Sequence, residues 1–288
     1  MNAEDARILN ARASAIAAEA NSLASVDRSW GSTVHPLADG WLVLSGAGMW
    51  VNQAVDVGVE ECLTAADVES LVALCEAAGV APTIEVTPST LPETVVRLRT
   101  SGFTHDPEHD VVLLTRSVDG PTVDFVDHVE VLPVRTEADL CQWQEVSAGG
   151  WAHTTAPDRR ASDAFAAAVH ALDGGHLYIA REYVAGEYVA GEYVAGEYVA
   201  GESTSGRSLG CAAMTLRDGV AILFGMSTLP ADRRRGVQGA LLCHRLHHAA
   251  EMGCDLAATT TVAGGVSERN LRRHGFEPRT TIKTFTRA

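Results

Sequence analysis

The sequence has no long run of apolar residues. No window approaches the roughly 18 uninterrupted apolar residues that a membrane-spanning helix needs. The first ten residues, MNAEDARILN, carry acidic side chains and lack the apolar core of a secretion signal. We therefore expect a cytoplasmic protein without a membrane partner.

Paired cysteines and a surplus of positive charge are also missing. The six cysteines are widely scattered and form no CxxC pair, which indicates reduced thiols in a cytosolic protein. The net charge of −15 argues against nucleic acid as the main partner, because a phosphate backbone would repel most of the surface. Residues 229–288 are an exception, with ten basic and five acidic side chains. This basic segment predicts a local site for an anion.

Length and patterning favour two domains. A chain of 288 residues with 46% hydrophobic and 20% charged residues is an ordinary globular chain, long enough for two domains. Residues 97–116 and 269–287 share the order helix, Arg-rich turn, Gly-Phe and strand, which indicates an ancient duplication. The stretch between the halves is polar and acidic and contains Gly-Pro, as a linker does. We predict a first domain over 1–118 with a leading helix, a linker over 119–130 and a second domain over 131–288.

The second half also contains an exact repeat. Residues 182–201 are four identical copies of EYVAG, and each copy alternates well enough for a β-strand. We interpret the repeat as an insertion that extends a hairpin. A mobile loop, or an exposed strand that binds a protein partner, are the alternatives.

The stretch that carries chemistry runs from Val220 to Ala240. A buried strand leads into a proline, an Arg cluster over 233–235, the turn that begins at Gly236, and a long helix. Backbone N–H groups in a Gly-containing turn at a helix N-terminus carry partial positive charge and bind phosphate oxygens. The sequence has no GxxxxGK[ST] loop, and a dinucleotide-type turn at 46–51 lacks its third glycine.

This stretch resembles the loop of the GNAT superfamily of acyl-CoA-dependent N-acetyltransferases. Arg233 and Gly236 match the RxxG part of the family's motif, while Gln238 stands where Gly or Ala is commoner. The segment 267–276, SERNLRRHGF, resembles the family's closing motif before its last strand. The resemblance covers about residues 130–288, and residues 30–118 match only the order of elements. It implies an α/β (α+β) fold of two GNAT-like domains, each a mixed, mostly antiparallel sheet flanked by helices, with a degenerate first domain.

The resemblance also implies a set of residues that bind acetyl-CoA as co-substrate. The backbone of Ser227, Thr228 and Leu229 would pair with the pantetheine arm, and one N–H would polarise the thioester carbonyl. Ser267 and Asn270 would lie near the pantetheine and the sulfur. The pyrophosphate would lie on the loop formed by Arg234, Arg235, Gly236, Val237, Gln238, Gly239 and Ala240.

The catalytic acid and base have no clear candidates. The position where the family often has a tyrosine acid is Leu271. No acidic residue occurs over 220–229, so Asp218, Glu145 and His153 are the candidates for a base, each also explained as a solvent-facing side chain. The catalytic residues therefore stay unassigned.

Two further features invite a structural explanation. His244 and His248 share a helix face, but an HExxH motif and an obvious third ligand are absent, so we predict no metal site and expect them on the solvated side of the helix. Trp151 could line an acceptor pocket, and we interpret it as a packing residue.

We predict an N-acetyltransferase in which the amine attacks acetyl-CoA directly in a ternary complex. The acceptor would be a small-molecule or peptide amine, and the acidic surface favours a cationic one. The alternatives are a non-catalytic acyl-CoA-binding sensor or scaffold, and an interaction protein that uses the EYVAG repeat.

Overall fold

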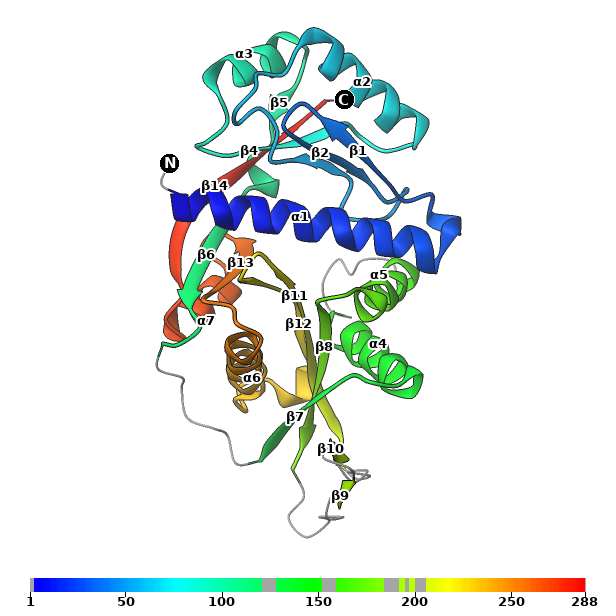
Figure 1. Ribbon diagram of the computed structural model, residues 1–288, viewed down its shortest axis with the longest axis vertical. Helices are drawn as coiled ribbons and strands as arrows, with labels where there is room; N and C mark the ends of the chain where they lie inside the picture. Colours follow the sequence, from blue (N-terminus) through cyan, green and yellow to red (C-terminus); the bar gives the residue numbers. More distant parts are fainter. Residues whose placement is uncertain are drawn as a thin grey trace.

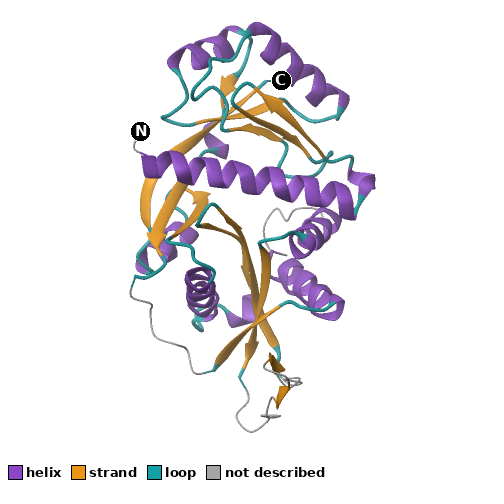
Figure 2. Ribbon diagram, viewed as in Figure 1, coloured by secondary structure: helices purple, strands orange, loops and turns teal. Residues whose placement is uncertain are grey.

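The computed structural model describes residues 3–120, 128–151, 159–183, 192–194, 197–199 and 206–287. A single mixed sheet of twelve strands runs through this part of the molecule, with helices on its faces (Figures 1 and 2). The predicted class, α+β with a mixed, mostly antiparallel sheet flanked by helices, is confirmed. Among the described helices, none combines the length and the apolar character needed to cross a membrane.

The first half alternates short strands with helices. Its strands are β1 (Thr33–Leu37), β2 (Gly40–Leu44), β3 (Gln53–Val55), β4 (Thr83–Val86), β5 (Thr104–His105) and β6 (Val111–Ser117). Its helices are α1 (Ala3–Val26), α2 (Ala65–Ala77) and α3 (Pro92–Thr100), with 3-10 turns η1 (Arg28–Trp30) and η2 (Pro107–His109). Thr64 and Asp67 form a reciprocal capping box that starts α2.

The second half has longer strands. They are β7 (Val129–Pro133), β8 (Gly175–Glu182), β9 (Glu192–Val194), β10 (Glu197–Val199), β11 (Ser208–Arg217), β12 (Val220–Thr228), β13 (Leu256–Val262) and β14 (Glu277–Thr286). Its helices are α4 (Glu137–Trp151), α5 (Arg159–Ala171), α6 (Val237–Glu251) and α7 (Val266–Arg273), with the 3-10 turn η3 (Pro230–Asp232).

Both halves repeat one pattern of strand pairing. The sheet order is β1-β2-β3-β4-β14-β6-β13-β12-β11-β8-β7, and β5 pairs with β14. Among the described strands, two neighbouring pairs are parallel, β3 with β4 and β12 with β13. Helix α2 connects the first pair and α6 the second, so the two connections correspond. This internal correspondence agrees with the duplication inferred from the sequence.

The two halves exchange their last strands. Strand β6 of the first half lies between β13 and β14 of the second half. The end of β14, from Lys283 to Thr286, lies beside β4 and β5 of the first half. Each half therefore completes the sheet of the other. The division at 119–130 stays a prediction, because residues 121–127 lie outside the described part.

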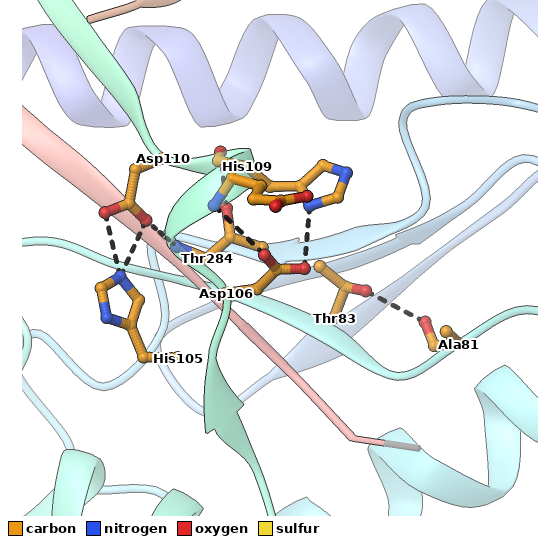
Figure 3. A network of polar contacts seen from close by, with 8 residues as sticks. Ala81, Thr83, His105, Asp106, His109, Asp110 and Thr284 are labelled. Carbon is orange, nitrogen blue, oxygen red and sulfur yellow. Dashed lines mark hydrogen bonds and ion pairs between the residues drawn. The ribbon is translucent and has the colours of Figure 1, made fainter.

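A polar network holds the end of β14 in the first half (Figure 3). The Thr284 amide donates to Asp110 at 3.0 Å, and the Thr284 hydroxyl donates to the His109 carbonyl at 3.0 Å. The Thr284 carbonyl accepts from the Asp106 amide at 2.8 Å. Asp110 also contacts His105 Nε2 at 2.9 Å. The exchanged strand thus has side-chain as well as main-chain partners.

Helix α1 crosses the middle of the molecule, between the α2 and α3 layer and the helices of the second half (Figure 1). It buries Ile8 against β12 and β13, and Ile16 with the alanines beside it against β2 and β3. Leu23 belongs to the core that α4 and α5 form with the sheet, which also contains Trp143 of α4. On the opposite face of the second-half sheet, α6 covers a separate core.

The EYVAG insertion lies between the paired strands β8 and β11. Its described residues include β9 and β10, which pair antiparallel with each other and not with the main sheet. The rest of the predicted insertion over 182–201 lies outside the described residues, so its form as an extended hairpin stays a prediction.

Candidate functional site

Strands β12 and β13 are paired over a short distance and then diverge. Pairing covers Val220–Ile222 and Leu256–Ala258. Beyond it, the Thr259 hydroxyl donates to the Leu223 carbonyl at 2.8 Å. Gly225 has φ of 60°, and the β11–β12 register shifts beside it, as in a β-bulge. The bulge turns β12 away from β13 and opens the sheet.

The predicted anion-binding loop lies at the N-terminus of α6, directly after β12. Gly236 is the N-cap residue in the left-handed region, with φ of 79°, and no side chain caps the helix. The Ala240 amide donates to the Gly236 carbonyl, so the helix begins its own hydrogen bonds there. Within the described part, the amides of Val237, Gln238 and Gly239 make no hydrogen bond. These three donors form the positive end of the helix dipole, which is a site for an anion.

The three loop arginines differ in what they contact. Arg233 donates to the Gly150 carbonyl of α4 at 3.1 Å. Arg235 donates to Asp232 at 2.7 Å and to Glu182 at 2.9 Å. Arg207 binds Asp232 through two hydrogen bonds of 2.6 and 2.7 Å, and these bonds lower the pKa of Asp232. Arg235 therefore braces the loop. Arg234 is exposed at φ of 64° and makes no ion pair within the described part, so it is the loop arginine available to a ligand.

The end of β12 offers one backbone segment to a ligand. The Leu229 amide donates to the Leu209 carbonyl of β11 at 2.9 Å. Because backbone groups alternate along a strand, Thr228 turns its N–H and C=O toward the open edge. Ser227 is buried, with its hydroxyl 3.5 Å from the Ser147 carbonyl. Of the three residues predicted to pair with pantetheine, Thr228 is the one whose backbone faces the opening.

Helix α7 closes the other side of the loop. Asn270 Nδ2 donates to Gln238 Oε1 at 2.7 Å, which joins α7 to the first turn of α6. Ser267, one turn earlier, is exposed. Leu271 is 5% exposed and belongs to the core beneath α6, so the position of the family's tyrosine is filled by a packing residue.

A cavity of about 480 Å³ lies on the face of the sheet opposite α6. It reaches the open end of the sheet at Gly225 and Thr260. Its aromatic walls come from both halves of the chain: Trp50, Trp143, Trp151, Phe165 and Phe224. Phe165 lies in edge contact with Trp50 at 5.1 Å and with Phe224 at 5.9 Å between ring centroids.

Glu19 of α1 places a carboxylate in the cavity wall. Its side chain is 4% exposed, and the Thr215 hydroxyl donates to it at 2.7 Å. Burial raises the pKa of Glu19 to about 7, against the opposing effects of Thr215, Arg217 and Arg12. Of the described residues that line the cavity, Arg12 is the only other charged one, and it binds Glu85 at 2.5 and 2.7 Å. Among the described residues, Glu19 therefore has no counter-ion in contact.

Glu19 is not among the residues predicted from the sequence. A signal is present: Arg12 and Glu19 lie on the same helical stripe as Ile8, Ile16 and Leu23, all of which the structure buries or half-buries. Charged residues on the apolar stripe of an Ala-rich helix point to a buried polar site.

The candidates for a catalytic base lie elsewhere. Asp218 stands in the turn before β12, a whole strand of nine residues from Thr228, which is about 30 Å. Glu145 is exposed on α4 and does not line the cavity. His153 lies outside the described residues. Neither Asp218 nor Glu145 is among the described residues that line the cavity, so both stay candidates from the sequence alone.

The expectation for the histidines of α6 was also wrong. His244 and His248 are half-buried against β8, where His248 Nδ1 contacts the Tyr178 hydroxyl at 2.6 Å. They follow Leu241 and Arg245 on the inner stripe of the helix, and burial lowers the pKa of His244 to about 4. Among the described residues, no group of three or more His, Cys, Asp or Glu side chains is arranged to hold a metal ion.

The corresponding loop of the first half is closed by an internal carboxylate. Between β3 and α2, the backbone amides of Gly58, Val59 and Glu61 donate to Asp39 at 2.6, 2.7 and 3.2 Å, and the Glu60 amide donates to it as well. Burial raises the pKa of Asp39, but these four bonds outweigh it and lower the pKa. Asp39 thus occupies four backbone donors of the connection between β3 and α2.

The chain resembles several solved structures over most of its length. A GCN5-related N-acetyltransferase from Kribbella flavida is 18% identical, with 96% of this chain and 95% of that chain covered and a TM-score of 0.62. A tandem GNAT protein from the clavulanic acid biosynthesis pathway is 13% identical, with 88% and 78% covered and a TM-score of 0.54. A GCN5-related N-acetyltransferase from Sphaerobacter thermophilus is 13% identical, with 96% and 91% covered and a TM-score of 0.51.

Comparison of the sequence itself is less informative. No protein-family model matches the chain, and no curated protein matches it. At identities below one fifth, the structural likeness establishes the fold and not the reaction. The chain has the fold of the GCN5-related N-acetyltransferases, the GNAT superfamily.

Proposed function

We propose that this protein transfers an acetyl group from acetyl-CoA to a primary amine, by direct attack of the amine in a ternary complex. The observation that carries the proposal is the meeting of two sites at one opening in the sheet. The unbonded amides at the start of α6 lie on one side, and the aromatic cavity reaches the opening at Gly225 from the other.

The residues at the loop fit a pyrophosphate. The amides of Val237, Gln238 and Gly239 supply donors, and the exposed Arg234 supplies charge. Arg235 and Asn270 act differently: Arg235 holds the loop through Asp232, and Asn270 holds the first turn of α6 through Gln238. The predicted binding residues thus fall into two groups. Some contact the ligand, and others, such as Arg235 and Asn270, hold the loop in place.

The backbone of β12 fits an extended arm. Thr228 directs its N–H and C=O to the open edge, where a pantetheine amide can pair with them. Acetyl-CoA supplies the acetyl thioester, and a backbone N–H near the bulge at Gly225 can polarise its carbonyl. This stabilisation uses main-chain donors, so it does not depend on a particular side chain.

The chain offers no acid at the position where the family often has one. Leu271 is buried there, and Tyr178 lies on the α6 side of the sheet, away from the cavity. A thiolate can leave without an acid when the attacking amine is neutral and well positioned. The proposed reaction therefore depends on positioning and on the protonation state of the amine.

Turnover tests the proposal. The full chain is incubated with acetyl-CoA and a mixture of small, aromatic, polyamine and peptide amines, and acetylated products are identified by mass spectrometry. Products are identified directly because a reagent for released coenzyme A would also label the exposed Cys62 and Cys141. An acetylated amine that forms only with folded protein supports the proposal. Binding of acetyl-CoA without any product would instead support a non-catalytic sensor or scaffold.

A further inference from the structure

The cavity beside the opening combines apolar walls with one uncompensated charge. Of its described lining residues, Arg12 and Glu19 are charged, and Arg12 is neutralised by its two bonds to Glu85. Glu19 has a neutral partner, the Thr215 hydroxyl, and its second oxygen makes no hydrogen bond within the described part. A buried carboxylate without a counter-ion is costly unless a cation joins it.

We propose that Glu19 binds the ammonium group of a primary amine whose remaining body is apolar and aromatic, and that it accepts the proton this amine must lose. The choice of substrate and the proton transfer rest on the proposed acetyl transfer. The binding of the amine does not, and it can be tested without acetyl-CoA.

The position of Glu19 along the sheet fits this role. Its partner Thr215 lies two residues along β11 from Ala213, about 7 Å away. A Cβ built on Gly225 would lie 3.2 Å from the Ala213 Cβ, so Ala213 marks the level of the bulge. This spacing accommodates an amine nitrogen in contact with the carboxylate, either directly or through one water molecule.

The size and the lining of the cavity determine which amines fit it. A volume of about 480 Å³ suits a small molecule. Trp50, Phe165 and Phe224 line it in edge contact with one another, and the Trp143 indole N–H is already donated to the Ala212 carbonyl at 3.1 Å. Apolar and aromatic side chains outnumber the uncharged polar ones, which are Gln53, Ser147, Ser162, Thr259 and Thr260. A polyhydroxylated amine would lose more hydration than these groups replace and would therefore be disfavoured.

Two other charged groups act on Glu19. Arg12 on α1 and Arg217 on β11 favour its ionised form, while burial acts against it and raises its pKa to about 7. Arg217 donates to the carbonyls of Asp173 and Leu216, so it is not a contact partner of Glu19. Below pH 7 the neutral acid loses its attraction for an ammonium ion, so amine affinity should fall about tenfold per pH unit there.

The proposed transfer moves two protons, forms one carbon–nitrogen bond and breaks one carbon–sulfur bond. One proton passes from the ammonium group to Glu19, and the neutral nitrogen forms a bond to the acetyl carbonyl carbon. The carbon–sulfur bond breaks and the electron pair leaves with the sulfur of coenzyme A. The second nitrogen proton passes to this thiolate, and Glu19 returns its proton to solvent. The products are an amide, a thiol and one proton.

Tryptophan fluorescence can test the binding directly, because Trp50, Trp143 and Trp151 all line the cavity. The probes are 2-phenylethylamine and 2-phenylethanol, which share an aromatic body and differ in charge. Without acetyl-CoA, at about pH 8, the wild-type chain should bind the amine at least about tenfold more tightly than the alcohol. At about pH 6 this preference should shrink about tenfold.

The substitution Glu19→Gln preserves shape and removes the charge, so this variant should bind amine and alcohol equally at both pH values. Glu69→Gln, the same change on the exposed face of α2, should behave as wild type. Equal affinities for the two probes in the wild type, no binding of either, or an unchanged preference in Glu19→Gln would each overturn the proposal. Amine binding without acetylated product would contradict the proposed function while leaving this inference intact.

Discussion

Replacing the buried Glu19 by glutamine should make the stability of the protein less dependent on pH. Glu19 is 4% exposed, and burial raises the pKa of its carboxyl group from 4.5 to about 7. A group whose pKa is higher in the folded state stabilises the fold below its unfolded pKa, and this contribution is lost as pH rises through the folded pKa. The wild type therefore loses free energy of unfolding between about pH 4.5 and 7, relative to the variant.

The magnitude follows from the shift. At about 1.4 kcal/mol per pKa unit, the complete effect is about 3 kcal/mol. Glutamine Oε1 can still accept a hydrogen bond from the Thr215 hydroxyl, so the variant keeps a counterpart of the 2.7 Å bond that the wild type makes. Urea unfolding of both proteins from about pH 5.5 to about pH 8.5 should show the difference growing by about 2 kcal/mol in favour of Glu19→Gln. A constant difference would mean that Glu19 titrates like an exposed carboxylate and would refute the reasoning.

Three other predictions concern single side chains. Arg234→Ala should weaken acetyl-CoA binding about tenfold in calorimetry. Arg235→Ala should chiefly lower the melting temperature, because Arg235 braces the loop through its ion pairs. Weaker binding in Arg235→Ala together with a lower melting temperature in Arg234→Ala would contradict the geometry of the loop. Asp39→Ala leaves four backbone donors without their acceptor and should cost about 2 kcal/mol in urea unfolding, so an unchanged midpoint would count against this contact. Tyr178→Phe removes the hydrogen bond to His248 and should cost about 1 kcal/mol while acetyl transfer is unchanged; loss of transfer would show that Tyr178 takes part in the reaction.

The loop at the start of α6 was predictable because its signal is local. A buried strand, an Arg cluster and Gly236 stand next to each other in the chain, and each has a conformational meaning of its own. The difference between Arg234 and Arg235 was not predictable. It depends on Glu182, which is 53 residues away in sequence and lies at the base of the repeat insertion.

The strand exchange and the Glu19 site depend on contacts that are distant in sequence. Strand β6 pairs with β13, and no alternation of residues specifies which edge a strand will join. Glu19 meets Thr215 across 196 residues, so its hydrogen-bond partner could not be read from the helix that carries it. Sequence patterns identified the elements, whereas the cavity arises from their packing.

Calorimetric titration of the full chain with acetyl-CoA tests the central claim most directly. One molecule should bind per chain, because Asp39 closes the corresponding loop of the first half. Gly236→Glu should abolish binding, since it places a carboxylate at the anion site. The matched control Gly253→Glu makes the same change just beyond the other end of α6, where the backbone φ is 80° and a Cβ added to the glycine would meet no atom within 4 Å. This control should bind acetyl-CoA as the wild type does. Absence of binding in the folded wild type, or equal binding by Gly236→Glu, would contradict the account.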